Sequence, residues 1–231
     1  EQLYEPADQV QFDFKEKVEL PFEDGLRIVH LHFGTLPFSD KCKIKGYPFT
    51  NFECFMDGIH SFFDCIGGMP KHVRIDNLSA CIKKIKKGNE RDYTQRFSDA
   101  IDYYGFKMLP CRPGKGSDKG DVEREIRTQS HRIKNLVKNK SIVFKDWDDL
   151  NQFLDEYVTK RESQSTRDRY ELEKTKLLPC PPADENVLCH IQIGGSNPYG
   201  TLRVDYSSYS IPDQMIGVQC RTVVGPYDVR I

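Results

Sequence analysis

The sequence predicts a mixed α/β layer domain followed by a small all-β barrel domain. The first part alternates strand patterns with amphipathic helix patterns, whereas the last part holds only short alternating segments between Gly and Pro turns. Between the two parts the periodicity fails and proline becomes frequent, which predicts a linker. We therefore expect a core at residues 1–158, a linker at 159–186 and a β-barrel at 187–231.

The core begins with a run of strands, expected at residues 7–15, 26–34 and 43–49. In the first, Val10 and Phe12 alternate with polar residues, which is typical of a strand with one buried face. Turn residues at 21–25 separate the first two strands and indicate a hairpin. Shorter strands are expected at 71–76 and 106–111.

Apolar spacing predicts four helices in the core. The first begins after Thr50 as N-cap, carries an apolar stripe from Phe52 to Ile66 and ends at Gly67. The other three are expected around Phe97–Tyr104, over residues 118–138, and from Asp146 to Tyr157. In the barrel domain the expected strands are residues 187–193, 201–204, 209–211, 216–222 and 227–231.

The composition is that of an ordinary globular protein, with 38% hydrophobic and 30% charged residues in a chain of 231. No apolar run approaches the roughly 20 residues of a membrane-spanning helix, and no signal peptide opens the chain. We expect a cytoplasmic protein without a membrane partner. Because the first residue is Glu1, we also expect a fragment of a longer protein.

Neither the cysteines nor the histidines form a recognisable reactive motif. The eight cysteines include no C-x-x-C pair and no zinc spacing with histidine, so we expect reduced, mostly buried thiols. No histidine belongs to a nucleophile motif, which argues against covalent catalysis. The net charge of −1 excludes no partner, because basic runs such as residues 83–87 are local. Such a run is also compatible with a solvated face.

Three acidic residues form the candidate site. Asp13 lies in the first strand on the face opposite to Phe12, Asp76 ends the strand at residues 71–76, and Glu123 lies in the third helix. Two strands and a helix can bring carboxylates together to hold two divalent cations for phosphoryl transfer. The alternative is that Asp13 and Asp76 are surface carboxylates and that Glu123 pairs with Arg127 four residues later.

A basic, glycine-rich segment at residues 113–120 precedes the third helix. Its Lys115 and Lys119, with Arg124 and Arg127 on the helix, suit contacts to a DNA backbone rather than base reading. The glycines do not fit the Walker spacing, so an ATP site in this chain is not expected.

The segments around these acids resemble those of DDE transposases and retroviral-type integrases. The resemblance rests on Gln11-Phe12-Asp13-Phe14, Ile75-Asp76-Asn77-Leu78 and Lys119-Gly120-Asp121-Val122-Glu123-Arg124. Segments at residues 104–106, 111–113, 177–181 and 209–212 are similar to those of IstA-type insertion-sequence transposases. Two positions depart from the family pattern: Phe14, where Trp is frequent, and Asp121, where a basic or small residue is usual.

The resemblance implies an RNase H-like core that cleaves and joins DNA at transposon ends. It implies two Mg²⁺ ions, for which Mn²⁺ can substitute, held by Asp13, Asp76 and Glu123. The implied partners are transposon-end and target DNA, further copies of the chain, and a separate AAA+ ATPase helper of IstB type. Two alternatives stay open, an inactive or domesticated relative that only binds DNA or recruits a partner, and a structure-selective nuclease of the same fold.

Overall fold

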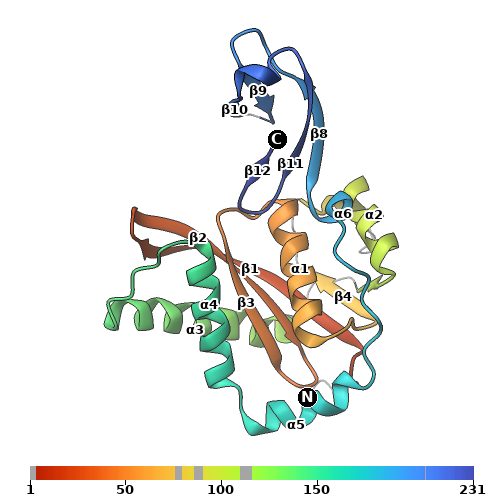
Figure 1. Cartoon of the computed structure of the whole chain (residues 1–231). Coiled ribbons are helices and arrows are strands. Elements are labelled where there is room, and N and C mark those ends of the chain that lie inside the picture. Colours follow the sequence, from red (N-terminus) through yellow and green to blue (C-terminus); the bar gives the residue numbers. More distant parts are fainter. Residues whose placement is uncertain (1–3, 76–79, 86–90, 110–115, 206) are drawn as a thin grey trace.

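A computed structural model describes most of the chain and shows a layered core with a β module at one end (Figure 1). The described residues are 4–75, 80–85, 91–109, 116–205 and 207–231. The side chains of residues 16, 85 and 116–125 lie outside this description.

A five-stranded mixed sheet forms the centre of the core. The strand order is β3-β2-β1-β4-β7, with β1, β2 and β3 antiparallel and β4 and β7 parallel to β1. Its strands are β1 (Gln9–Phe22), β2 (Gly25–Leu36), β3 (Lys41–Tyr47), β4 (His72–Ile75) and β7 (Lys107–Met108). The first two strands are longer than predicted, because Val18, Leu20 and Phe22 continue the buried pattern of β1.

Helices cover both faces of this sheet, as the fold class requires. They are α1 (Phe52–Ile66), α2 (Gln95–Tyr104), α3 (Gly116–Asn139) and α4 (Trp147–Arg161). α1 and α2 share one apolar cluster with β1 and β4, and α3 and α4 share a second with β1, β2 and β3. The predicted mixed sheet flanked by helices is therefore confirmed.

The helix α1 approaches β2 closely because two glycines leave room. A Cβ atom on Gly58 would lie 2.5 Å from His32 Nδ1, and one on Gly34 would lie 2.5 Å from the Phe62 ring. The helix begins one residue later than predicted, since Asn51 is the N-cap and its side chain accepts from the Cys54 amide. Because glycine has no side chain at these two positions, α1 and the sheet can pack in direct contact.

A short hairpin that the sequence did not predict follows β4. Its strands are β5 (Ile82–Ile85) and β6 (Arg91–Tyr93), paired antiparallel with an irregular register. Lysine, asparagine, glycine and glutamate are poor strand formers, so the pattern gave no strand signal.

The segment expected to be a linker is mostly ordered structure on the core. Residues 159–186 hold the end of α4, the helix α5 (Gln164–Lys174) and the start of α6 (Glu185–Leu188). The Tyr170 hydroxyl donates to the Ile66 carbonyl at 2.8 Å, and Leu178 pairs with Met69 as an isolated bridge. We call residues 163–188 the strap. The boundaries of the domains stay a prediction.

The C-terminal residues form a small all-β module. Its strands make a three-stranded sheet of β12, β11 and β8 and a two-stranded sheet of β10 and β9. They are β8 (His190–Gly195), β9 (Thr201–Val204), β10 (Ser207–Ser210), β11 (Gln219–Val224) and β12 (Val229–Arg230). The apolar cluster of the module contains the buried residues Leu202, Val204, Ile211 and Cys220. A short 3₁₀ helix, η1 (Asp213–Met215), follows β10.

Candidate active site

Asp13 lies on β1, at the centre of the sheet between β2 and β4. Directly opposite on β2 is Phe33, and residues opposite one another on antiparallel strands share a face. Phe33 packs in the same apolar cluster as Ile126 of α3. The half-buried Asp13 therefore lies on the sheet face that α3 covers. Its Oδ1 accepts a hydrogen bond from the Phe14 amide at 2.8 Å.

A β-bulge gives Asp13 its apolar neighbours on that face. The register of β1 against β2 shifts between Lys15 and Val18, and Lys17 has a φ of 59°. An extra residue in one strand reverses the alternation of side chains beyond it. As a result Phe12 packs under α1, whereas Val18 packs under α3 and α4 on the face of Asp13.

The second predicted ligand follows the strand next to Asp13. On β4, Ile75 lies beside Phe12 in parallel register, and Val73 and Ile75 both pack in the α1 cluster. Alternation leaves Arg74 on the other face, the face of Asp13. The described part of this strand ends at Ile75, so Asp76 itself lies outside the described residues.

The third predicted ligand belongs to α3. This helix contacts β1, and its buried residues Ile126, Ile133 and Val137 pack against the sheet. The backbone of Glu123 lies within the helix, but its side chain is outside the described part of the structure. The metal-binding assignment of Glu123 and its alternative pairing with Arg127 therefore both stay predictions.

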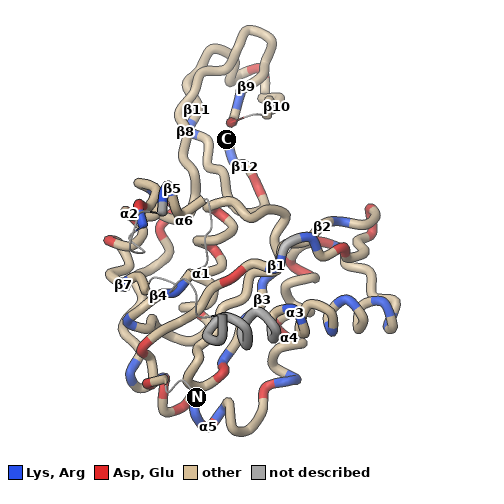
Figure 2. The backbone as a smooth tube through the Cα atoms, turned by 180° about the vertical axis from the view of Figure 1, so that it is seen from behind, with Lys and Arg blue, Asp and Glu red and all other residues tan. Residues whose placement is uncertain are grey.

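Of the four predicted DNA-binding residues, the structure describes one completely. Arg127 is exposed on α3. Lys115 lies outside the described residues, as do the side chains of Lys119 and Arg124. Lysine and arginine recur along the described part of the helix toward its C-terminal end (Figure 2). The basic character of α3 thus continues beyond the predicted cluster.

Two buried donors beside Asp13 were not predicted. Gln11 on β1 and Arg74 on β4 are paired in the parallel register, two residues before Asp13 and Asp76. Within the described part of the chain, Gln11 Nε2 and Arg74 Nε are buried without a hydrogen-bond partner. A buried donor normally has an acceptor. The sequence could have indicated them, because residues two apart on a strand lie on the same face, and Gln11 and Arg74 each precede a predicted ligand by two residues.

Several histidines and cysteines lie in the core. His32 is buried beneath Phe12, with ring centroids 5.3 Å apart, and burial lowers its pKa to about 3. The ring of His60 contacts the Tyr104 hydroxyl at 3.0 Å. The seven cysteines that the structure describes are free thiols, and burial raises the pKa of Cys54 to about 12. These groups have packing roles.

No group of three or more His, Cys, Asp or Glu side chains suited to a metal ion occurs among the described residues. Two of the three predicted ligands have side chains outside that part of the chain. None of the described helices is both long and apolar enough to cross a bilayer.

The chain is similar to several known proteins. No family model matches the chain. A putative transposase for insertion sequence element IS5376 of Geobacillus stearothermophilus is 29% identical over 81% of this chain and 48% of its own length. The transposase for insertion sequence element IS21 of Pseudomonas aeruginosa is 26% identical over 92% of this chain and 55% of its own length.

The fold has a solved counterpart as well. A chain in the structure of a simian T-cell lymphotropic virus intasome, in complex with PP2A regulatory subunit B56 gamma, superposes with a TM-score of 0.50. It is 14% identical and covers 78% of this chain and 59% of that one. The chain is thus similar in sequence to insertion-sequence transposases and similar in fold to a retroviral intasome chain. The chain spans about half the length of the two transposases above.

Proposed function

We propose that this chain is the catalytic core, with an appended β module, of a DNA transposase that cleaves and joins DNA at transposon ends. The observation that carries the proposal is the register of β1 and β4. Phe12 lies beside Ile75, and Asp13 and Asp76 are the next residues of the two strands. If the same register continued by one residue, it would bring the two acids side by side on the face of α3.

Helix geometry supports Glu123 as the third member. On an α-helix, residues three apart lie on the same side, one turn from each other. Glu123 precedes the buried Ile126 by three residues, so its position is one turn toward the start of α3 on the side that packs against the sheet. That side is the one facing the strand of Asp13.

The donor set fits divalent magnesium. Carboxylate oxygens are hard ligands, and Mg²⁺ binds through one or two carboxylates together with substrate phosphates and water. When bound, two such ions would supply Lewis-acid stabilisation and an activated nucleophile, water for cleavage and a 3′-hydroxyl for joining. In our proposal Asp13, Asp76 and Glu123 would hold these ions. Mn²⁺ would substitute for Mg²⁺.

The chain's own basic residues would hold the DNA. Phosphate contacts position a duplex without reading its sequence. We assign this role to Lys115, Lys119, Arg124 and Arg127, which precede and flank Glu123 in the chain. The proposed partners are transposon-end DNA, target DNA, further copies of the chain and an AAA+ ATPase helper of IstB type. The names of the matched relatives favour an active transposase over an inactive DNA-binding relative or a structure-selective nuclease.

The test is cleavage and strand transfer by the full-length transposase that contains this chain. Asp13→Asn, Asp76→Asn and Glu123→Gln should each reduce the rate by at least about 100-fold, because each removes a ligand of a charge-stabilising ion. DNA binding should persist. The matched control is Glu19→Gln, an exposed acid on β1 beyond the bulge, which should leave the rate unchanged. Normal strand transfer by any of the three variants would exclude that residue from the site.

A further inference from the structure

The β5–β6 hairpin has a fixed base on the core. Cys81 and Ile82, where the hairpin begins, are buried in the α1 cluster. Thr94, just after β6, donates through its amide to the Cys81 carbonyl at 2.9 Å and through its hydroxyl to the Ala80 carbonyl at 3.2 Å. The Tyr93 ring packs on Phe97 with centroids 5.4 Å apart. These contacts therefore hold the base of the hairpin against the core.

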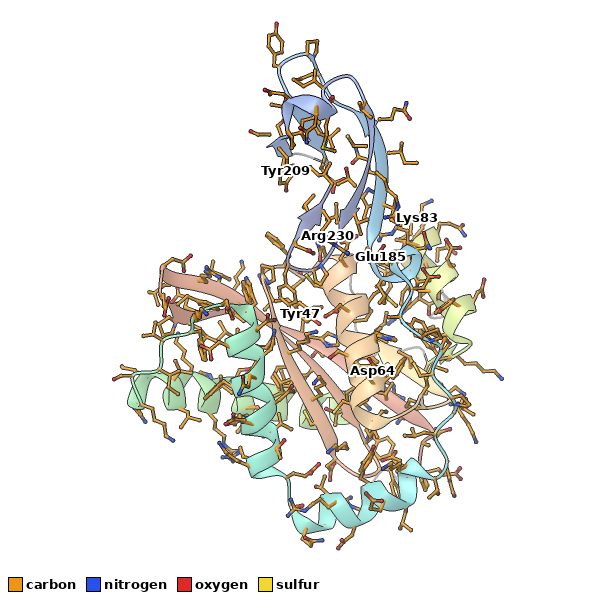
Figure 3. The ribbon with its side chains drawn as sticks, viewed as in Figure 1. Tyr47, Asp64, Lys83, Glu185, Tyr209 and Arg230 are labelled. Atoms are coloured by element: carbon orange, nitrogen blue, oxygen red, sulfur yellow. The ribbon has the colours of Figure 1, made fainter. Side chains whose placement is uncertain are left out.

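Lys83 and Lys84 on β5 are exposed, and neither forms an ion pair with another described residue. Lys84 lies opposite Asp92 in register, without an ion pair between them. Figure 3 shows Lys83 on the side of the core where α2 and α6 lie.

The lysines of β3 behave differently. Lys41 binds Glu162 at 2.6 Å, Lys43 binds Asp155 at 2.8 Å, and a third lysine, at position 45, binds an α1 carboxylate at 2.7 Å. With 35 acidic residues in the chain, carboxylates are not scarce. The unpaired charges of Lys83 and Lys84 are thus free to attract an external anion.

The hairpin is also tied to the strand that precedes Asp76. Arg91 on β6 donates through Nη1 to the Ile75 carbonyl at 3.4 Å. Ile75 is the last described residue of β4, and Asp76 follows it in the chain. Arg91 is half-buried. A displacement of the hairpin would therefore shift the end of β4 through this hydrogen bond.

We propose that the β5–β6 hairpin binds the sugar-phosphate backbone of DNA through Lys83 and Lys84, and that Arg91 couples this contact to the end of β4 at Ile75. The proposal rests on the function proposed above. DNA is favoured over an acidic protein as the partner because the hairpin is fastened to the strand end where the reacting phosphate would lie. Lys83 and Lys84 are DNA-binding residues, and Arg91 is a positioning residue.

The first test measures DNA affinity of the full-length transposase at several salt concentrations, without cleavage. Each phosphate contact adds about 0.9 to the slope of log affinity against log salt. Lys83→Ala/Lys84→Ala should reduce that slope by about 1.8, equally for unrelated duplexes. The matched control is Lys174→Ala/Lys176→Ala, which removes two exposed charges from the strap and should leave the slope unchanged.

An unchanged slope in the hairpin variant would overturn the proposal. So would a loss confined to stimulation by an ATPase helper, which would assign the hairpin to a protein partner. Because this test reads binding alone, its outcome does not depend on metal-dependent catalysis. Absence of Mg²⁺-dependent cleavage by the unmodified transposase would instead count against the proposed function.

The second test isolates the coupling through Arg91. At saturating DNA, Arg91→Met should lower kcat about tenfold and raise the Mg²⁺ concentration for half-maximal rate several-fold, and Arg91→Lys should recover part of both. A melting temperature close to that of the unmodified protein shows that the variant is folded. If DNA affinity falls while kcat and the Mg²⁺ dependence stay unchanged, Arg91 only binds DNA and the coupling is excluded.

Discussion

The Tyr227 ring stacks on the Tyr47 ring, with centroids 5.4 Å apart and planes inclined by 14°. Tyr227 belongs to the β11–β12 turn, and its hydroxyl donates to the Gly46 carbonyl at 2.8 Å. Asn151 of α4 donates to the same hydroxyl at 3.0 Å and accepts from the Gly46 amide at 2.7 Å. Figure 3 shows Tyr47 at the end of the core that faces the β module. One tyrosine thus fastens the module to β3 and α4.

We expect Tyr227→Ala to lower the free energy of unfolding by about 2–4 kcal/mol, because it removes a mostly buried ring and two hydrogen bonds. Tyr227→Phe keeps the stacking and should cost only about 1 kcal/mol. Thermal unfolding measures both. The control is Tyr199→Ala in the same module, whose side chain is 89% exposed and should contribute little. Equal effects at the two positions would mean that Tyr227 is not an anchor.

The buried His32 should make the core sensitive to acid. Its folded pKa of about 3 lies below the usual value of 6.5, because burial disfavours the charged ring and Lys45 adds repulsion. Between these two values the unfolded chain binds the proton and the folded chain does not, so stability falls as the pH falls. At pH 5 the loss from this residue is about 2 kcal/mol.

His32→Phe should remove that loss, since it keeps a ring against Phe12 without a titrating group. The measurement is denaturant unfolding at pH 7.5 and pH 5, compared with His131→Gln, an exposed histidine on α3. If the unmodified protein, His32→Phe and His131→Gln all lost the same stability at pH 5, His32 would not be the cause of the acid sensitivity.

Glu173 on the strap should have the opposite pH dependence. The fully buried carboxyl accepts the Ala7 amide at 3.0 Å, and burial raises its pKa above the usual 4.5. The folded state favours the neutral acid. The stabilisation that Glu173 contributes to folding is therefore fully present below its pKa in the unfolded chain and is lost as the pH rises through its pKa in the folded chain. Glu173→Gln keeps an acceptor for Ala7 and should stabilise the chain at pH 8 but not at pH 4.

The control for this prediction is Glu171→Gln, an exposed acid on the same helix, which should be neutral at both pH values. Glu173→Ala leaves the Ala7 amide unpaired and should destabilise the chain by about 1–3 kcal/mol. Stabilisation by Glu173→Gln that is equal at pH 4 and pH 8 would contradict the ionisation argument.

Periodicity predicted the elements with one strongly apolar face. The start of α1 was predicted to within one residue, and α4 begins one residue after the predicted Asp146, which caps it through the Asp149 amide. The helix α5 lies within the predicted linker at residues 159–186 and gave no helix signal there, because it is polar on most sides and buries only Thr166 and Glu173. This helix is attached to the core through hydrogen bonds of a buried carboxyl and a tyrosine hydroxyl, so its sequence shows no apolar periodicity.

The sequence also predicted that Asp13 lies on the sheet face opposite to Phe12, because this prediction needs only the alternation of polar and apolar residues along a strand. The bulge after Lys15 could not be predicted from the sequence. Phe12 and Val18 are separated by an even number of positions, which in a regular strand places both on one face, but in the fold they face opposite sides of the sheet. The partners of Asp13 depend on strand order, so Gln11 and Arg74 became neighbours only in the folded chain.

The most direct test is a crystal of the transposase with transposon-end DNA and Mn²⁺, examined by anomalous scattering. Our account predicts two Mn²⁺ peaks about 3.5–4 Å apart. Asp13 should contact both, Asp76 one and Glu123 the other. The control is the Asp13→Asn protein, in which at least one peak should be lost. Peaks ligated by other residues, or Asp13 directed to the α1 face of the sheet, would contradict the account.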